Sequence, residues 1–354
     1  MNSPFARRES AARYSTGHAR RLLLAVLALP AITVGQSAAA EQARAPTFQV
    51  LDSPGDLNFN QLLGINDGRV IAGYFGDGAT IANNGYLLVP KNHYSTENFT
   101  HLPAGDSASQ TQAIGINNNN QPDIVGFYTD TATGFTHGFV DSNSVQTAID
   151  DPAGLPPNVK APVQNLLSIN DLGKAAGFWV DNNDHEHGFV VAIDAQNPQA
   201  SKFTEIPPAT FAGAVATQAS GITGANTVCG FWTDENGNNH GFFGRLGHRL
   251  ASFDVRIKGM TATSTSPFGC NNEGEIVGSF TDGAGAVHGF IFNRGRFTQF
   301  DATGSSQTAA FGVAGTLING VNDLGEIVGF FSDGTKVHGF VELEPRSDGD
   351  NGRD

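Results

Sequence analysis

The chain has 354 residues, with 34 acidic residues against 20 lysines and arginines, so its formal net charge is −14 at neutral pH. Such an acidic surface repels phosphate groups, which argues against nucleic acid and anionic membranes as partners. Glycine is abundant, at 44 residues, as expected of a chain that makes many tight turns.

The first forty residues have the pattern of a secretory signal. Arginines, the last of them Arg20 and Arg21, precede an apolar run over residues 22–34, and the alanines at 38–40 offer a cleavage site. A run of this length is too short for a membrane span, which needs about twenty residues. We therefore predict that residues 1–40 are removed and that the protein is exported to the periplasm or the cell exterior. The arginine pair leaves the twin-arginine route open beside ordinary secretion.

A unit of about fifty residues repeats six times within residues 41–344. Each unit contains a G-I-N-like segment, an I-V-G-F-F-like run, an H-G-F-like run and an F-T-x-x-D-like run, and residues 320–341 are the clearest copy of the first three. The glycine of the second run recurs at positions 73, 126, 177, 230, 278 and 329. Each run is short, rich in β-branched and aromatic residues and bounded by turn residues, so each unit predicts four strands.

The second run is apolar at successive positions, so we expect it to be covered on both faces. Radially stacked blades provide that cover, and a repeat of this length is typical of a propeller. We predict an all-β protein, a six-bladed β-propeller that is monomeric. The sixth unit ends after its H-G-F run, so the strand at 48–52 is expected to complete the last blade and close the ring. Residues 345–354 are polar and are predicted to be disordered.

These motifs, repeated behind a signal peptide, resemble the bacterial extracellular repeats of the HAF family. The resemblance covers residues 48–343. The tripeptide His-Gly-Phe occurs at 137, 187, 240, 288 and 338, and the first unit has Asn84-Gly85-Tyr86 instead. The resemblance implies export and a repeated β fold, and it implies no catalytic residue.

Five units place an aspartate and a histidine at opposite ends of the second turn, where the two could hydrogen-bond across the hairpin or bind a metal ion. The pairs are Asp130 with His137, Asp181 with His187, Asp234 with His240, Asp282 with His288 and Asp333 with His338. Because a catalytic site is needed once and these pairs recur, we interpret them as stabilising contacts within each blade.

Two of these turns begin like a calcium loop. Asp181 with Asn183, and Asp234 with Asn236, follow a D-x-N pattern, so calcium is a candidate cofactor there. Neither loop continues as an EF-hand, because Ala192 and Arg245 stand where a bidentate glutamate is required. A polar hairpin tip without metal is the competing interpretation.

The third and fourth units depart most from the repeat, and they hold both tryptophans, Trp179 and Trp232. Two aromatic residues one blade apart could stack on a sugar ring, or they could belong to the core, since Phe or Tyr fills the slot elsewhere. Together with Asp184 and His185 they form our predicted ligand site, on the rim of blades three and four. The predicted ligand is carbohydrate-like or a cell-surface group.

The predicted function is that of an exported binding or scaffold module. The alternative is a propeller enzyme, of glycoside hydrolase or lyase type, that acts on an extracellular polysaccharide, although the sequence has no G-x-S-x-G, H-E-x-x-H or Walker A motif.

The chain has two cysteines, Cys229 and Cys270, in neighbouring units. Either a disulfide between those units or a buried free thiol is compatible with the sequence.

Overall fold

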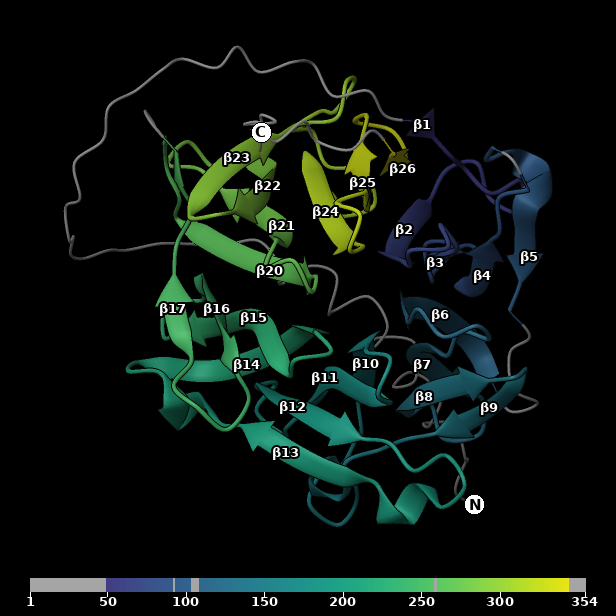
Figure 1. Cartoon of the computed structure of the whole chain (residues 1–354), viewed down its shortest axis with the longest axis vertical. Helices are drawn as coiled ribbons and strands as arrows, with labels where there is room; N and C mark the ends of the chain where they lie inside the picture. Colours follow the sequence, from purple (N-terminus) through teal and green to yellow (C-terminus); the bar gives the residue numbers. More distant parts are fainter. Residues whose placement is uncertain (1–48, 92, 103–107, 258–259, 344–354) are drawn as a thin grey trace, which may run out of the picture.

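The computed structural model describes residues 49–91, 93–102, 108–257 and 260–343, and these form six four-stranded antiparallel sheets around a common centre (Figure 1). The protein is a six-bladed β-propeller, as the repeats predicted. Within each of the first five blades, consecutive strands are neighbours and the first strand lies nearest the centre. The predicted signal at 1–40 and the predicted tail at 345–354 lie outside the described residues.

The strands of the first three blades follow from the centre outward. They are β2 (Asn60–Ile65), β3 (Ile71–Phe75), β4 (Asn84–Leu88) and β5 (Phe99–His101); β6 (Ala108–Ile116), β7 (Ile124–Asp130), β8 (Thr136–Ser142) and β9 (Val145–Ala148); and β10 (Gln164–Ile169), β11 (Lys174–Val180), β12 (Glu186–Ala192) and β13 (Lys202–Ile206). Short 3-10 turns lie in the connections, at η1 (Thr96–Asn98), η2 (Pro152–Gly154), η3 (Pro198–Ala200) and η4 (Pro208–Thr210).

The other three blades complete the ring. Blade four has β14 (Ala214–Ile222), β15 (Thr227–Asp234), β16 (Asn239–Arg245) and β17 (Ala251–Phe253), blade five has β20 (Ser264–Cys270), β21 (Ile276–Thr281), β22 (Val287–Asn293) and β23 (Arg296–Phe300), and blade six has β24 (Thr316–Val321), β25 (Ile327–Ser332), β26 (Val337–Glu342) and β1 (Gln49–Val50). A small hairpin, β18 (Arg256–Ile257) with β19 (Met260–Thr261), separates blades four and five. The described helices are all single 3-10 turns, and none could cross a membrane.

The two ends of the repeat region meet in the last blade. Strand β1 pairs antiparallel with β26, with Val50 opposite Phe340, so the N-terminal strand is the outer strand of blade six. This confirms the predicted closure. A salt bridge of 2.6 Å between Arg69 of the first blade and the buried carboxylate of Glu326 in the last blade adds a second contact across the same junction.

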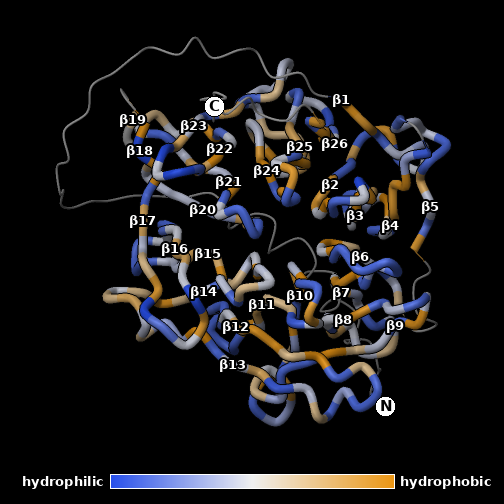
Figure 2. Tube along the Cα trace, in the orientation of Figure 1, coloured by the Kyte–Doolittle hydropathy of each residue, from blue (hydrophilic) through white to orange (hydrophobic). Residues whose placement is uncertain are grey.

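The hydrophobic core lies mostly between blades, where the sheets face one another. One cluster joins Val125 of blade two to Leu166 of blade three, and another joins Val277 of blade five to Ile318 of blade six. The phenylalanine of every H-G-F motif is fully buried. Figure 2 shows hydrophobic segments in every one of the six blades.

The glycine that marks the repeat is required by close packing inside the blade. A methyl group added at Gly329 would lie 2.1 Å from the carbonyl oxygen of Leu317 and 2.8 Å from the ring of Phe340. The equivalent glycines of the other five blades meet an inner-strand carbonyl at 1.9–2.3 Å. A side chain there would separate the first two strands of the blade, so the position admits only glycine.

Candidate functional site

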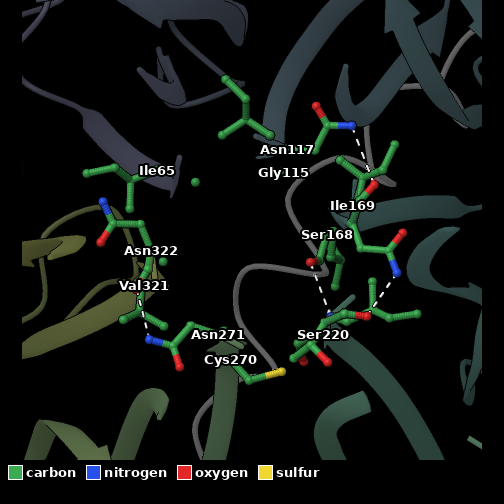
Figure 3. Close-up of a pocket in the computed structure, with 18 of the residues that line it drawn as sticks. Ile65, Gly115, Asn117, Ser168, Ile169, Ser220, Cys270, Asn271, Val321 and Asn322 are labelled. Carbon is green, nitrogen blue, oxygen red and sulfur yellow. Dashed lines mark hydrogen bonds between the residues drawn. The ribbon is translucent and has the colours of Figure 1, made fainter. Parts of the chain in front are cut away.

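A cavity of about 90 Å³ lies at the centre of the ring, where the inner strands end (Figure 3). Each inner strand has a β-bulge near this point, for example between Leu62 and Gly64 in β2 and between Ala219 and Gly221 in β14. Neighbouring inner strands lie close together here, and Gly64 has room only for hydrogen because the carbonyl oxygen of Ile114 would lie 2.3 Å from an added methyl group.

Asparagine side chains hydrogen-bond one blade to the next around this cavity. In each link, the amide nitrogen of the asparagine in the G-I-N-like segment donates to the backbone carbonyl of the equivalent residue in the following blade. The links run from Asn66 to Asn117 (3.0 Å), Asn117 to Asn170 (3.4 Å), Asn170 to Thr223 (2.9 Å), Asn271 to Asn322 (2.8 Å) and Asn322 to Asn66 (3.2 Å). Blade four has Thr223 instead of asparagine, so the link from blade four to blade five is missing from this amide ring.

The next residue of each segment forms a second ring. Here the backbone N–H donates to a side-chain oxygen of the following blade. The links run from Asp67 to Asn118 (2.7 Å), Asn118 to Asp171 (2.7 Å), Gly224 to Asn272 (2.9 Å), Asn272 to Asp323 (2.8 Å) and Asp323 to Asp67 (2.9 Å). Blade four again breaks the pattern, because Gly224 has no side chain to accept from blade three.

The second ring gathers carboxylates at the mouth of the cavity. Burial raises the pKa of Asp67 above its ordinary value, a backbone hydrogen bond from Asp323 opposes the rise, and the charges of Asp323 and Asp171 add to it. The cavity is small, and most of its polar groups join one blade to another. We therefore assign the two rings a structural role in holding the blades in register.

The histidine of the H-G-F motif contacts carboxylates on both sides in blades four, five and six, and on one side in blades two and three. Its Nδ1 faces the aspartate that follows the outer strand, which is Asp150 in blade two (2.6 Å), Asp254 in blade four (2.9 Å), Asp301 in blade five (2.9 Å) and Asp52 in blade six (2.7 Å). Its Nε2 faces the aspartate of the hairpin turn, at 3.3 Å for Asp181, 3.8 Å for Asp234, 3.7 Å for Asp282 and 3.2 Å for Asp333. The predicted pairing across the turn is thus present at hydrogen-bonding distance in blades three and six.

The outer-strand aspartate is the partner that the sequence interpretation missed. It is the last residue of the F-T-x-x-D run, and its recurrence was the signal that could have revealed it. The hydrogen bond to Asp150 raises the pKa of His137. Burial disfavours the charged form of His240, but the bonds to Asp254 outweigh burial and its pKa is also raised. Four blades share this arrangement, so it stabilises blades and is not a single catalytic centre.

Trp179 is part of the interior, one of the two roles the sequence left open for it. It is buried, its ring stacks on His187 with centroids 4.0 Å apart, and its indole N–H donates to Glu205 at 3.4 Å. Asp184 and His185 occupy the tip of the hairpin between β11 and β12. They do not line either of the two cavities described here.

Trp232 lines a larger cavity of about 420 Å³ on blade four, which we call the blade-four cavity. Its ring stacks on Phe211 and on His240, with centroids 5.8 and 4.2 Å away, and its indole N–H donates to the hydroxyl of Ser252 at 2.8 Å. The other lining residues come from the β13–β14 connection and the β16–β17 turn. The full lining is Thr210, Phe211, Ala212, Trp232, His248, Arg249, Leu250 and Ser252.

The blade-four cavity combines an aromatic wall with positive charge. Trp232 remains partly accessible, whereas the equivalent Trp179 is buried. Arg249 is exposed, and the described residues give its guanidinium no ion pair or hydrogen bond. The cavity therefore offers both an aromatic ring and a cation that is free to meet an anionic group.

The carboxylates proposed for calcium are engaged with their own turns. Asp181 Oδ1 accepts the backbone N–H groups of Asn183 and His185, and Asp234 Oδ1 accepts those of Asn236 and Asn238. Hydrogen bonds to turn amides lower the pKa of both aspartates against the opposing effect of burial. In the part of the chain that the structure describes, no three His, Cys, Asp or Glu side chains are grouped to hold a metal ion.

No protein-family model and no curated protein matches the chain, so the resemblance to HAF repeats stays a prediction. Among solved structures, the chain is similar to the six-bladed lectin of Aleuria aurantia, with 11% identity over 81% of this chain and 91% of the lectin and a TM-score of 0.45. It is also similar to a Trypanosoma rangeli sialidase, with 8% identity over 85% of this chain and 60% of the sialidase and a TM-score of 0.48.

A prolyl endopeptidase gives a third similarity, with 8% identity over 77% of this chain and a TM-score of 0.43. The chain spans about 40% of the length of that enzyme. At such identities and TM-scores, none of the three similarities indicates what this chain binds.

Proposed function

We propose that this protein is an exported β-propeller binding module, and that its blade-four cavity binds a carbohydrate-like ligand that carries a carboxylate. The observation that carries the proposal is a cavity of about 420 Å³ that is lined both by the partly accessible Trp232 and by the exposed Arg249. This volume falls in the range of small-molecule sites.

Each wall of the cavity suits one part of such a ligand. The apolar face of a sugar ring packs against aromatic surface, which the accessible part of Trp232 provides here. The hydroxyl of Ser252 can exchange hydrogen bonds with ring hydroxyl groups. The planar guanidinium of Arg249 matches a carboxylate in a bidentate geometry.

Export supports the choice of ligand. The basic segment, short apolar run and alanines of residues 1–40 are the features of a secretion signal. Carbohydrates of cell surfaces and matrices lie where an exported protein would meet them. Intact-mass measurement of secreted protein should give an N-terminus at Glu41, and a mature protein that begins at Met1 would contradict export.

Binding is tested with a panel of matched saccharides, in which D-glucuronate-terminated oligosaccharides are compared with their D-glucose-terminated counterparts. We expect the acidic series to bind more tightly. Trp232→Ala and Arg249→Ala should each weaken that binding about tenfold or more, a loss of about 1.4 kcal/mol. Failure of every acidic saccharide to bind would contradict the proposal.

The neighbouring blade supplies the control. Trp179 fills the same slot in blade three, and phenylalanine or tyrosine occupies this slot in other blades, so Trp179→Phe should fold and bind as the wild type does. Equal loss of affinity in Trp179→Phe and Trp232→Ala would place the ligand elsewhere. A reducing-sugar assay on the same saccharides should show no turnover, and release of sugar would favour the propeller enzyme instead.

A further inference from the structure

The two cysteines of the chain come from different blades and meet beside the central cavity. Cys229 lies on β15 of blade four and Cys270 ends β20 of blade five. A methyl group added at Gly221 would lie 2.7 Å from the sulfur of Cys229 and 3.0 Å from the sulfur of Cys270. Both sulfurs therefore border the same small space, which is free because residue 221 is glycine.

The cysteines stand at the one junction where the amide ring is open. Five of the six junctions have an asparagine link, and the link from Thr223 to Asn271 is the missing one. Cys270 directly precedes Asn271, and Gly221 lies two residues before Thr223. The blade-four to blade-five junction thus lacks a hydrogen bond that every other junction has, and it has a pair of thiols instead.

We propose that Cys229 and Cys270 form a disulfide that ties blade four to blade five. This modification is independent of the proposed carbohydrate site. It would supply a covalent link at the junction that has no amide link. The loop it closes, residues 229–270, contains the β18–β19 hairpin, so the bond would also restrict this insertion in the unfolded chain.

The two thiols differ in how readily an oxidant can reach them, so one should react before the other. Cys270 is partly exposed and lines the central cavity, where Figure 3 shows its sulfur, whereas Cys229 is fully buried. Burial, together with its hydrogen bond to Cys270, raises the pKa of the Cys229 thiol. Cys270 should therefore react first with an oxidant that enters from the cavity.

The reaction balances with a small disulfide as the oxidant. The Cys270 thiolate attacks one sulfur of the small disulfide, which breaks the S–S bond, forms a mixed disulfide and releases one small thiolate. Cys229 then loses its proton and attacks the Cys270 sulfur, which releases the second small thiol. In total two protein thiols are oxidised to one disulfide, and the small disulfide is reduced to two thiols.

The test uses the full chain and bis(2-hydroxyethyl) disulfide as the oxidant. Reduced protein is exposed to the oxidant, denatured without reductant, alkylated and measured by intact mass. We expect a mass lower by two hydrogen atoms, no alkyl group and a peptide that links residues 229 and 270. Two alkyl groups, or a disulfide between two copies of the chain, would overturn the proposal.

Single substitutions separate the two steps. In Cys229→Ser the mixed disulfide at Cys270 should persist, because the second thiol is absent, whereas in Cys270→Ser the folded protein should not react. Oxidation should raise the melting temperature of the wild type by about 5 °C and leave both variants unchanged. If the wild-type protein also stopped at a mixed disulfide on Cys270, the Cys229 thiol would be unable to reach the Cys270 sulfur, and the proposal would be wrong.

Discussion

A histidine of the H-G-F motif lies between two carboxylates and against an aromatic ring. In blade six, His338 contacts Asp52 at 2.7 Å and Asp333 at 3.2 Å, and its ring centroid lies 5.3 Å from that of Phe331. Blade three lacks the outer aspartate, and His187 there keeps the hairpin aspartate Asp181 and the stacking on Trp179. The ring contact is thus common to all five histidines, whereas the outer carboxylate is not.

Glu186 gives a prediction at the residue scale. It precedes His187, it is half-buried, and no described residue pairs with its carboxylate. Burial raises the pKa of Glu186 from 4.5 to about 7. Below pH 4.5 the carboxyl is protonated in both the folded and the unfolded chain, so it does not affect stability. Between pH 4.5 and 7 the unfolded chain ionises first, so the free energy of unfolding falls as the pH rises.

Glu186→Gln removes the carboxyl group whose ionisation lowers the free energy of unfolding. The variant should match the wild type near pH 4 and be more stable at pH 8, by at most about 3 kcal/mol. Chemical denaturation at both pH values measures the difference. Glu235→Gln, at an exposed hairpin tip of blade four, is the control for the loss of one carboxylate from the surface. If the stability difference between Glu186→Gln and the wild type were the same at pH 4 and pH 8, the raised pKa assigned to Glu186 would be contradicted.

At the scale of the element, the G-I-N-like turn both closes a hairpin and joins two blades. Asn170 accepts the backbone N–H groups of Leu172 and Lys174 with its Oδ1, and it donates to Thr223 of the next blade at 2.9 Å. The motif was visible in the sequence, and it correctly predicted the turn. Its second role was not apparent, because the acceptor lies some fifty residues away in another copy of the motif.

Thr223→Asn should complete the amide ring. Threonine and asparagine have similar volumes, and an asparagine here could donate to the carbonyl of Asn271 as its counterparts do. We expect the reduced protein to gain about 1 kcal/mol in the free energy of unfolding. The reverse change, Asn170→Thr, should lose at least as much, because the Asn170 side chain also accepts two backbone N–H groups of its own turn. A Thr223→Asn variant no more stable than the wild type would show that the ring adds nothing at this junction.

At the scale of the whole molecule, the sequence determined the architecture more fully than the site. The number of blades and the pairing of β1 with β26 follow from repeated motifs, because each motif specifies the same strands and turns. The blade-four cavity does not repeat. Trp232 was predicted as a ligand residue, but Phe211 and Arg249 come from connections outside the motifs, and only the folded chain brings them to Trp232.

The chain contains two tryptophans, one in the cavity and one in the interior, and this makes ligand binding directly observable. In Trp179→Phe the fluorescence comes from Trp232 alone, and in Trp232→Phe it comes from Trp179 alone. Titration of Trp179→Phe with a D-glucuronate-terminated oligosaccharide should change the emission in a saturable way, with the affinity measured for the wild type. Binding at this site is contradicted if the saccharide binds the wild type but the emission of Trp232, measured in Trp179→Phe, stays constant through saturation. It is also contradicted if only the emission of Trp179, measured in Trp232→Phe, responds. In either case the ligand does not occupy the blade-four cavity.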